Sequence, residues 1–284
     1  MLGLMTVAAT LLGSALTGPD PRWLTLPNGL TLRYEERGDT TGDPLILLHG
    51  YTDSRQSFER LASQLPYRVR TIAIDLRGHG DSDRPGSYDI REMANDVVRF
   101  IEAKRLRRVT LVGHSMGSLV AREAARKARS RVAGLVLIGS GVTFDNEVVR
   151  GLQAELNSLG DAIDREFVEG FQRSTLYAPV PAGFLDKVIE ASSTVPPAIW
   201  RDVLVQILEY NDSRSLASIR VPTMLMWGSR DAIVSRTDQE ALLSGIPGSY
   251  LVEYRDVGHA PHWERPAAVV ADLLAFLEGE PDRR

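Results

Sequence analysis

Val109-Thr110-Leu111-Val112-Gly113-His114-Ser115-Met116-Gly117-Ser118-Leu119-Val120 is the stretch that decides the fold of this chain. The apolar run 109–112 predicts a buried strand, and the residues after Gly117 predict a helix. A serine between two spaced glycines at a strand-to-helix turn is the pattern of a nucleophile elbow, in which the serine takes a strained backbone conformation. The glycines let strand and helix approach closely, and the helix N-terminus favours developing negative charge. We therefore predict that Ser115 is a nucleophile; the alternative is an ordinary tight turn with a capping serine.

The bulk composition is that of an ordinary globular protein. The chain has 284 residues, of which 43% are hydrophobic and 25% charged, a length that suits one large α/β domain or two small ones. The net charge of −4 gives no reason to expect a nucleic-acid or membrane partner. Cysteine is absent, which excludes disulfides, thiolate metal sites and a cysteine nucleophile. No apolar run is long enough to span a bilayer.

An apolar segment precedes the first predicted strand. Met1 to Gly18 carries no charged residue, so it lacks the basic region of a secretory signal. It could be an upstream extension, a poor signal peptide or a helix that packs on the rest of the protein. We treat residues 1–21 as an N-terminal extension and expect a cytoplasmic protein.

Strands and helices alternate along the rest of the chain. A hairpin is predicted over residues 23–36, with its turn at Pro27-Asn28-Gly29. Continuous apolar runs predict further strands, and helical spacing predicts helices between them. Strands are expected at 44–48, 68–74, 109–112, 132–138, 223–227 and 250–254, and helices at 89–106, after 117, between the last two strands and at 267–277. This alternation predicts an α/β fold with a mainly parallel twisted sheet flanked by helices.

One interval between strands is unusually long. Roughly 80 residues separate the strand ending near Gly139 from the strand starting near Val221, far more than an ordinary connection. Apolar residues recur through it at helical spacing, and prolines punctuate it. We therefore predict a helical cap at 141–215, inserted into a core formed by 22–140 and 216–284. The cap is expected to set substrate choice rather than chemistry.

A serine nucleophile needs a base, and the base needs an orienting acid. The chain has five histidines, and His259 lies in a loop just after the last predicted strand, where an open α/β sheet places its ligand site. The acid is expected between serine and histidine in chain order, and Asp231 follows the preceding strand. The alternative is that Asp231 is an ordinary residue of a turn. Asp145, which follows an earlier strand, is the rival acid.

Four signatures occur in order along the chain: His49-Gly50 after a strand, the polar turn from Asp75 to Ser82, the serine elbow, and the late loops with Asp231 and His259. Together they resemble the α/β-hydrolase family over nearly the whole length. The joint match is much more specific than any single motif.

The resemblance implies a role for each residue of the site. Ser115 is expected to be the nucleophile, His259 the base and Asp231 the orienting acid. The backbone amides of Tyr51 and Met116 are expected to form an oxyanion hole. The resemblance also implies that the reaction needs no cofactor and no metal.

Other side chains are weaker candidates. His262 follows His259 by three residues, but Pro261 intervenes and no third metal ligand is evident, so a structural or pocket-rim role is favoured. The turn with Asp75, Arg77 and Asp81 resembles a structural turn of the family. Pocket-lining candidates are His49, His114, Phe144, Leu176, Tyr177, Trp200 and His262. His49 is expected chiefly to shape the oxyanion loop, and the cap aromatics chiefly to form the cap's own core.

The sequence thus predicts a cofactor-independent serine hydrolase that cleaves carboxylic ester-like bonds through an acyl-enzyme, as a carboxylesterase or lactonase. A serine at the elbow argues against the family's epoxide hydrolases and haloalkane dehalogenases. The loop after Gly50 lacks the extra glycine usual in its carbon–carbon bond hydrolases, which weakens that alternative. Haloperoxidase or perhydrolase activity and a triad-bearing small-molecule receptor also stay open. The expected partner is a small ester or lactone, with no nucleic acid or membrane, and the protein is expected to be a monomer or homodimer.

Overall fold

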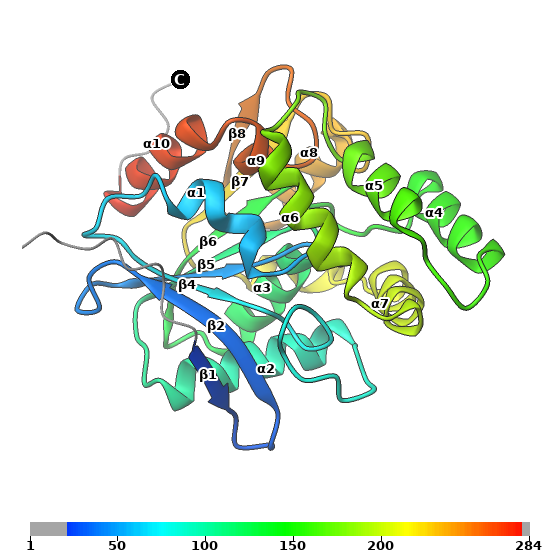
Figure 1. The fold of residues 1–284 in the computed structure, drawn as a ribbon. Helices are drawn as coiled ribbons and strands as arrows, with labels where there is room; N and C mark the ends of the chain where they lie inside the picture. Colours follow the sequence, from blue (N-terminus) through cyan, green and yellow to red (C-terminus); the bar gives the residue numbers. More distant parts are fainter. Residues whose placement is uncertain (1–21, 280–284) are drawn as a thin grey trace, which may run out of the picture.

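An eight-stranded sheet runs through the centre of the structure, a computed structural model that describes residues 22–279 (Figure 1). The expected extension at 1–21 lies outside the described residues. The strand order is β1-β2-β4-β3-β5-β6-β7-β8. The strands are β1 (Arg22–Thr25), β2 (Thr31–Arg37), β3 (Pro44–Leu48), β4 (Arg70–Ile74), β5 (Val109–His114), β6 (Val132–Ile138), β7 (Thr223–Gly228) and β8 (Tyr250–Tyr254).

The sheet is mainly parallel, which confirms the fold predicted from the alternation of strands and helices. β1 and β2 form the expected antiparallel hairpin, β2 also pairs antiparallel with β4, and the other neighbouring pairs are parallel. The register places Leu48 opposite Gly113, and His114 opposite Ile138. The loops that follow β3, β5 and β6 therefore meet at one edge of the sheet.

Helices cover both faces of the sheet. Along β3, Ile46 and Leu48 belong to one buried cluster, while Leu45 and Leu47 belong to the other, as the two-residue period of a strand requires. The first face carries α2 (Ile90–Ala103), α3 (Met116–Lys127) and α8 (Arg236–Gly245). The second face carries α1 (Glu59–Ala62) and α10 (Pro266–Leu277).

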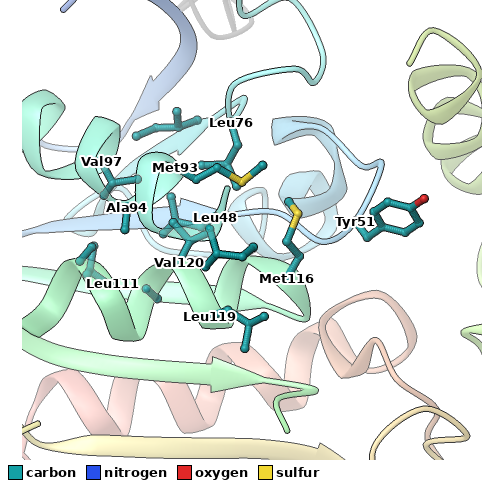
Figure 2. Close-up of a cluster of buried hydrophobic side chains, with 14 of the residues drawn as sticks. Leu48, Tyr51, Leu76, Met93, Ala94, Val97, Leu111, Met116, Leu119 and Val120 are labelled. Atoms are coloured by element: carbon teal, nitrogen blue, oxygen red, sulfur yellow. The ribbon is translucent and has the colours of Figure 1, made fainter. Parts of the chain in front are cut away.

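The packing of α2 and α3 on the sheet fixes the start of α3. Figure 2 shows Met93 and Val97 of α2 on the same side as Val120 of α3 and Leu48 of β3, and Leu119 of α3 belongs to the same buried cluster. All five side chains are fully buried. Each burial stabilises the fold by about 1.5–3 kcal/mol relative to an exposed side chain. The first residues of α3 are thereby held rigidly against the end of β3.

Four helices connect β6 to β7, as the helical spacing of this interval predicted. They are α4 (Glu147–Ser158), α5 (Arg165–Ser174), α6 (Ala182–Ser193) and α7 (Pro197–Glu209), followed by the 3₁₀ turn η2 (Ser213–Ser218). The Asn146 and Asp164 side chains cap α4 and α5, and prolines precede or open α6 and α7. We call residues 147–209 the helical insert. Its status as a separate cap domain stays a prediction.

Two short helices were not predicted from the sequence, because each has too few residues to show the helical period of apolar side chains. They are α1 with its preceding 3₁₀ turn η1 (Arg55–Phe58), and α9 (Pro261–Glu264). Within residues 22–279, no helix has the length and apolar character needed to cross a membrane.

Candidate active site

Ser115 stands at a sharp turn between β5 and α3. Its φ of 50° is a strained value for a residue with a side chain. A Cβ added at Gly113 would lie 2.3 Å from the Gly117 carbonyl oxygen, and one at Gly117 would lie 2.1 Å from that of Leu48. Both positions therefore require glycine. The Ser115 hydroxyl makes no capping bond to α3, so it is available for chemistry.

His259 and Asp231 form a buried pair. The His259 Nδ1 atom lies 2.8 Å from Asp231 Oδ2, and their side chains are 2% and 0% exposed. The other carboxylate oxygen, Asp231 Oδ1, accepts hydrogen bonds from the Ile233 and Val234 amides at 2.8 and 3.0 Å. His259 Nε2 is buried and has no hydrogen-bond partner among residues 22–279. This arrangement fixes the proton on Nδ1 and leaves Nε2 free to accept one.

The His259 ring lies at the same strand end as Ser115. The Ser115 amide donates to the Ile138 carbonyl at 2.9 Å. At the next residue, Gly139, an added Cβ would lie 3.0 Å from atoms of the His259 imidazole. Asp145 instead pairs with Arg150 on the surface, at 2.5 Å. The structure therefore joins His259 to Asp231 and places Asp145 elsewhere.

The loop after β3 is held in place around Tyr51. The Tyr51 hydroxyl donates to the Trp200 carbonyl at 2.6 Å. His49 Nδ1 donates to the Gly50 carbonyl at 2.8 Å, and its Nε2 accepts from the Leu76 amide at 3.0 Å. Burial lowers the pKa of His49 to about 4, so its ring is neutral. Both ring nitrogens of His49 are occupied, so this residue shapes the loop and does not line a pocket.

Met116 opens α3 directly after Ser115. As the first residue of the helix, it has an amide with no partner inside the helix. Its side chain is buried, and Figure 2 shows it between the core and Tyr51. The geometry of the Met116 amide is thus compatible with the oxyanion role implied by the sequence.

The polar turn after β4 is occupied with structural contacts. Asp75 is fully buried and accepts from the Arg55 amide at 2.6 Å, from Arg55 Nη1 at 2.5 Å and from the Asp81 amide at 3.0 Å. Arg77 Nε donates to Asp96 at 2.6 Å. These bonds tie the turn to η1 and α2 and account for its polar residues.

The sequence profile of the Alpha/beta hydrolase family matches residues 45–273, which is most of the chain. The protein belongs to the alpha/beta hydrolase family. It is 28% identical over 266 residues to Lipase 3 of Moraxella sp., covering 90% of this chain and 84% of that one. It is 30% identical over 263 residues to the AB hydrolase superfamily protein YisY of Bacillus subtilis, covering 87% and 95%.

The fold likeness extends to solved structures of the family. The esterase EaEST from Exiguobacterium antarcticum matches with a TM-score of 0.83, over 90% of this chain and 98% of that one. The two sequences are 23% identical, so the likeness concerns the fold.

The pocket candidates of this alpha/beta hydrolase fall into different environments. The Phe144 ring stands edge-on to the His259 ring at a centroid distance of 6.4 Å. Trp200 is 1% exposed and packs against Phe167 and Phe171 of the insert, and Leu176 is partly buried against the hydrophobic core. Tyr177 is 54% exposed. Of these, Phe144 has a direct ring contact with the base.

Two further histidines are buried behind His259. The rings of His114 and His262 lie 4.5 Å apart, and His262 also stacks on Phe58 at 5.0 Å. Burial lowers the pKa of His262 to about 3 and that of His114 well below its usual value. In the described part of the chain, no group of three or more His, Cys, Asp or Glu side chains is placed to hold a metal.

Glu264, which was not predicted from the sequence, ties the insert to the loop of His259. Its carboxylate accepts from the amides of Gly258 at 2.9 Å, Tyr177 at 3.2 Å and Ala178 at 2.7 Å. The amide of His259 itself donates to the Thr175 carbonyl at 2.8 Å. No sequence signal connects residues this far apart, because the contact depends on how the insert docks.

An apolar groove of about 730 Å³ lies between α4 and α5. Leu152 and Phe167 are among its lining residues from the insert, together with Phe171, whose ring contacts Tyr51 at 5.7 Å. Ala232 and Ile233, which directly follow Asp231, complete it on the sheet side. The groove therefore adjoins both the loop of the acid and the loop of Tyr51.

Proposed function

We propose that this protein is a cofactor-independent serine hydrolase of carboxylic esters or lactones. The observation that carries the proposal is the buried His259–Asp231 pair with its free Nε2 atom, whose ring lies at the strand end where Ser115 sits in a strained turn. The matched family supports hydrolysis, and the Moraxella relative is named a lipase.

In the proposed reaction, the Ser115 hydroxyl attacks the carbonyl carbon of the substrate while His259 Nε2 takes its proton. Asp231 stabilises the imidazolium that forms. The tetrahedral oxyanion accepts hydrogen bonds from the Tyr51 and Met116 amides, each contributing up to about 3 kcal/mol of barrier lowering. His259 then protonates the leaving alcohol. Water, activated by the same base, hydrolyses the acyl-enzyme and restores Ser115.

The apolar groove is the proposed place for the hydrocarbon part of the substrate. Its lining is largely apolar, and it adjoins the loops of Asp231 and Tyr51. Apolar pockets with few polar groups select ligands by shape and by buried area. The helical insert would then act as a cap that selects among acyl or alkyl chains.

Replacing the nucleophile tests this proposal. Ser115→Ala is expected to reduce hydrolysis of p-nitrophenyl acetate and butyrate by about 10⁴-fold or more, because the attacking atom is gone. A fluorophosphonate probe should label the wild type and leave this variant unlabelled. Ser63→Ala, which removes an exposed hydroxyl next to α1, is the matched control and should behave as wild type. Activity of a folded Ser115→Ala protein within tenfold of wild type would refute the proposal.

A further inference from the structure

Asp53 is a buried carboxylate that the proposed triad does not use. It lies in the loop after β3, two residues beyond Tyr51, and is 3% exposed. Its Oδ1 atom accepts a hydrogen bond from Gln172 Nε2 of α5 at 3.1 Å. Its own amide donates to the Gly50 carbonyl at 3.3 Å. A buried carboxylate with these partners links the loop of Tyr51 to the insert.

The link belongs to a buried polar network. Gln172 Nε2 also donates to Ser192 Oγ of α6 at 2.7 Å, and Thr52 Oγ1 lies 3.4 Å from the same oxygen. Thr52, Gln172 and Ser192 are each at most 1% exposed. Polar groups buried this deeply must keep their partners, so the network fixes the loop and the two helices in one relative position.

Asp53 also borders the serine elbow. Its Oδ2 atom lies 3.8 Å from His114 Nδ1, and His114 directly precedes Ser115. A Cβ added at Gly50 would lie 2.9 Å from both of these atoms. The carboxylate therefore sits where the loop of Tyr51 and the elbow come together.

The charge of Asp53 faces titratable groups of the site. His114 faces it from the end of β5, and the His259 ring, in the loop after β8, lies 5.1 Å from the His114 ring. α5 and α6 present the neutral side chains of Gln172 and Ser192, and His262 of α9 lies behind His114. Burial raises the pKa of Asp53 to about 7, and the hydrogen bond from Gln172 partly opposes this rise.

We propose that Asp53 is a positioning residue of this catalytic centre, whose carboxylate anchors the oxyanion loop to α5. This inference rests on the proposed function. A loop that shifts by a fraction of an ångström would misplace the Tyr51 amide, and errors of this kind lower turnover more than binding.

The test compares Asp53→Asn with wild type on p-nitrophenyl butyrate. We expect kcat to fall by about 10- to 100-fold with KM within about threefold, because binding is largely retained. The control is Asp43→Asn, which removes an exposed carboxylate paired with Arg108 and should change neither quantity.

Other outcomes are equally decisive. A fall in kcat accompanied by an equally large rise in KM would show that Asp53 merely supports the fold, and wild-type kcat would overturn the inference entirely. If Asp53→Asn fails to fold, Gln172→Leu removes the donor while keeping the carboxylate, and an unchanged kcat in that variant would also overturn it. Activity retained by Ser115→Ala would reject the proposed function itself, so the two failures are distinguishable.

Discussion

At the scale of single residues, the chemistry depends on which nitrogen of His259 carries the proton. The Asp231 carboxylate accepts from Nδ1 and is itself held by two backbone amides. It therefore has little freedom to turn away from the ring. A carboxylate fixed in this way selects one tautomer and stabilises the positive charge that develops during attack.

Asp231→Asn should lower kcat by about 10⁴-fold with little change in KM, because the amide selects the wrong tautomer and removes the charge. Asp145→Asn is the matched control, since Asp145 is joined to Arg150 on the surface and should leave kcat near wild type. Steady-state kinetics on a chromogenic ester checks both. A large fall in kcat for Asp145→Asn, with kcat near wild type for Asp231→Asn, would instead assign the acid to the loop after β6.

The sequence could predict Ser115, Asp231 and His259 because each follows a recognisable strand, and parallel strands bring such loops to one edge. It could not predict Asp53 or Glu264 as members of the site. Their partners lie on the insert, and neither hydrophobic period nor chain order reveals how the insert docks. Buried polar contacts between distant segments become visible once the elements have positions in space.

At the scale of elements, the helical insert contacts the proposed machinery on two sides. The loop of Tyr51 is tied to α5 and α7, and the loop of His259 is tied to the end of α5. The sequence predicted an insert that governs substrate choice and leaves chemistry to the core. That division stays a prediction, and these bonds show that the insert also contacts the core loops.

Trp200, one of the pocket-lining candidates from the sequence, is a poor probe of substrate choice. Trp200 packs against aromatic neighbours in the core of the insert, and its carbonyl holds Tyr51. Truncating a buried tryptophan destabilises a protein by about 3–5 kcal/mol. A substitution of Trp200 would change stability and substrate specificity together, so glycines that line the groove are better probes of specificity.

Gly170→Leu in α5 should shift substrate preference toward short acyl chains. Gly170 lines the groove, and an added Cβ there meets no atom within 4 Å, so the new side chain can fill the groove without a clash. Replacing a helical glycine also raises helix propensity by up to about 1 kcal/mol, so the protein should stay folded. The check is the ratio of kcat/KM for octanoate and acetate esters.

The matched control for this prediction is Gly183→Leu in α6. Gly183 also has open space around its Cβ position, but it does not line the groove. Its chain-length profile should equal that of wild type. Identical profiles for the two variants would show that the groove between α4 and α5 takes no part in substrate choice.

At the scale of the whole molecule, buried histidines connect stability to pH. Burial lowers the pKa of His49 to about 4 and that of His79 and His262 to about 3. In the unfolded chain these rings titrate near 6.5. The contribution of these neutral rings to the free energy of unfolding is therefore fully present above about pH 6.5. It is lost as the pH falls toward 3, because the unfolded state binds the protons. Asp53 has the opposite effect: its raised pKa lets the folded state bind a proton at a higher pH than the unfolded chain does, so its contribution to stability grows as the pH falls.

His79→Gln isolates one of these contributions. His79 is fully buried, its Nδ1 donates to the Arg77 carbonyl at 2.9 Å, and it lies outside the proposed catalytic groups. Wild type and variant are unfolded with urea at pH 7 and at pH 5. The variant is expected to start less stable, but its free energy of unfolding should fall by about 2 kcal/mol less between the two pH values, at about 1.4 kcal/mol per unit below pH 6.5. If the free energy of unfolding falls equally in the two proteins between pH 7 and pH 5, then His79 is already protonated in the folded state or its burial does not set its pKa.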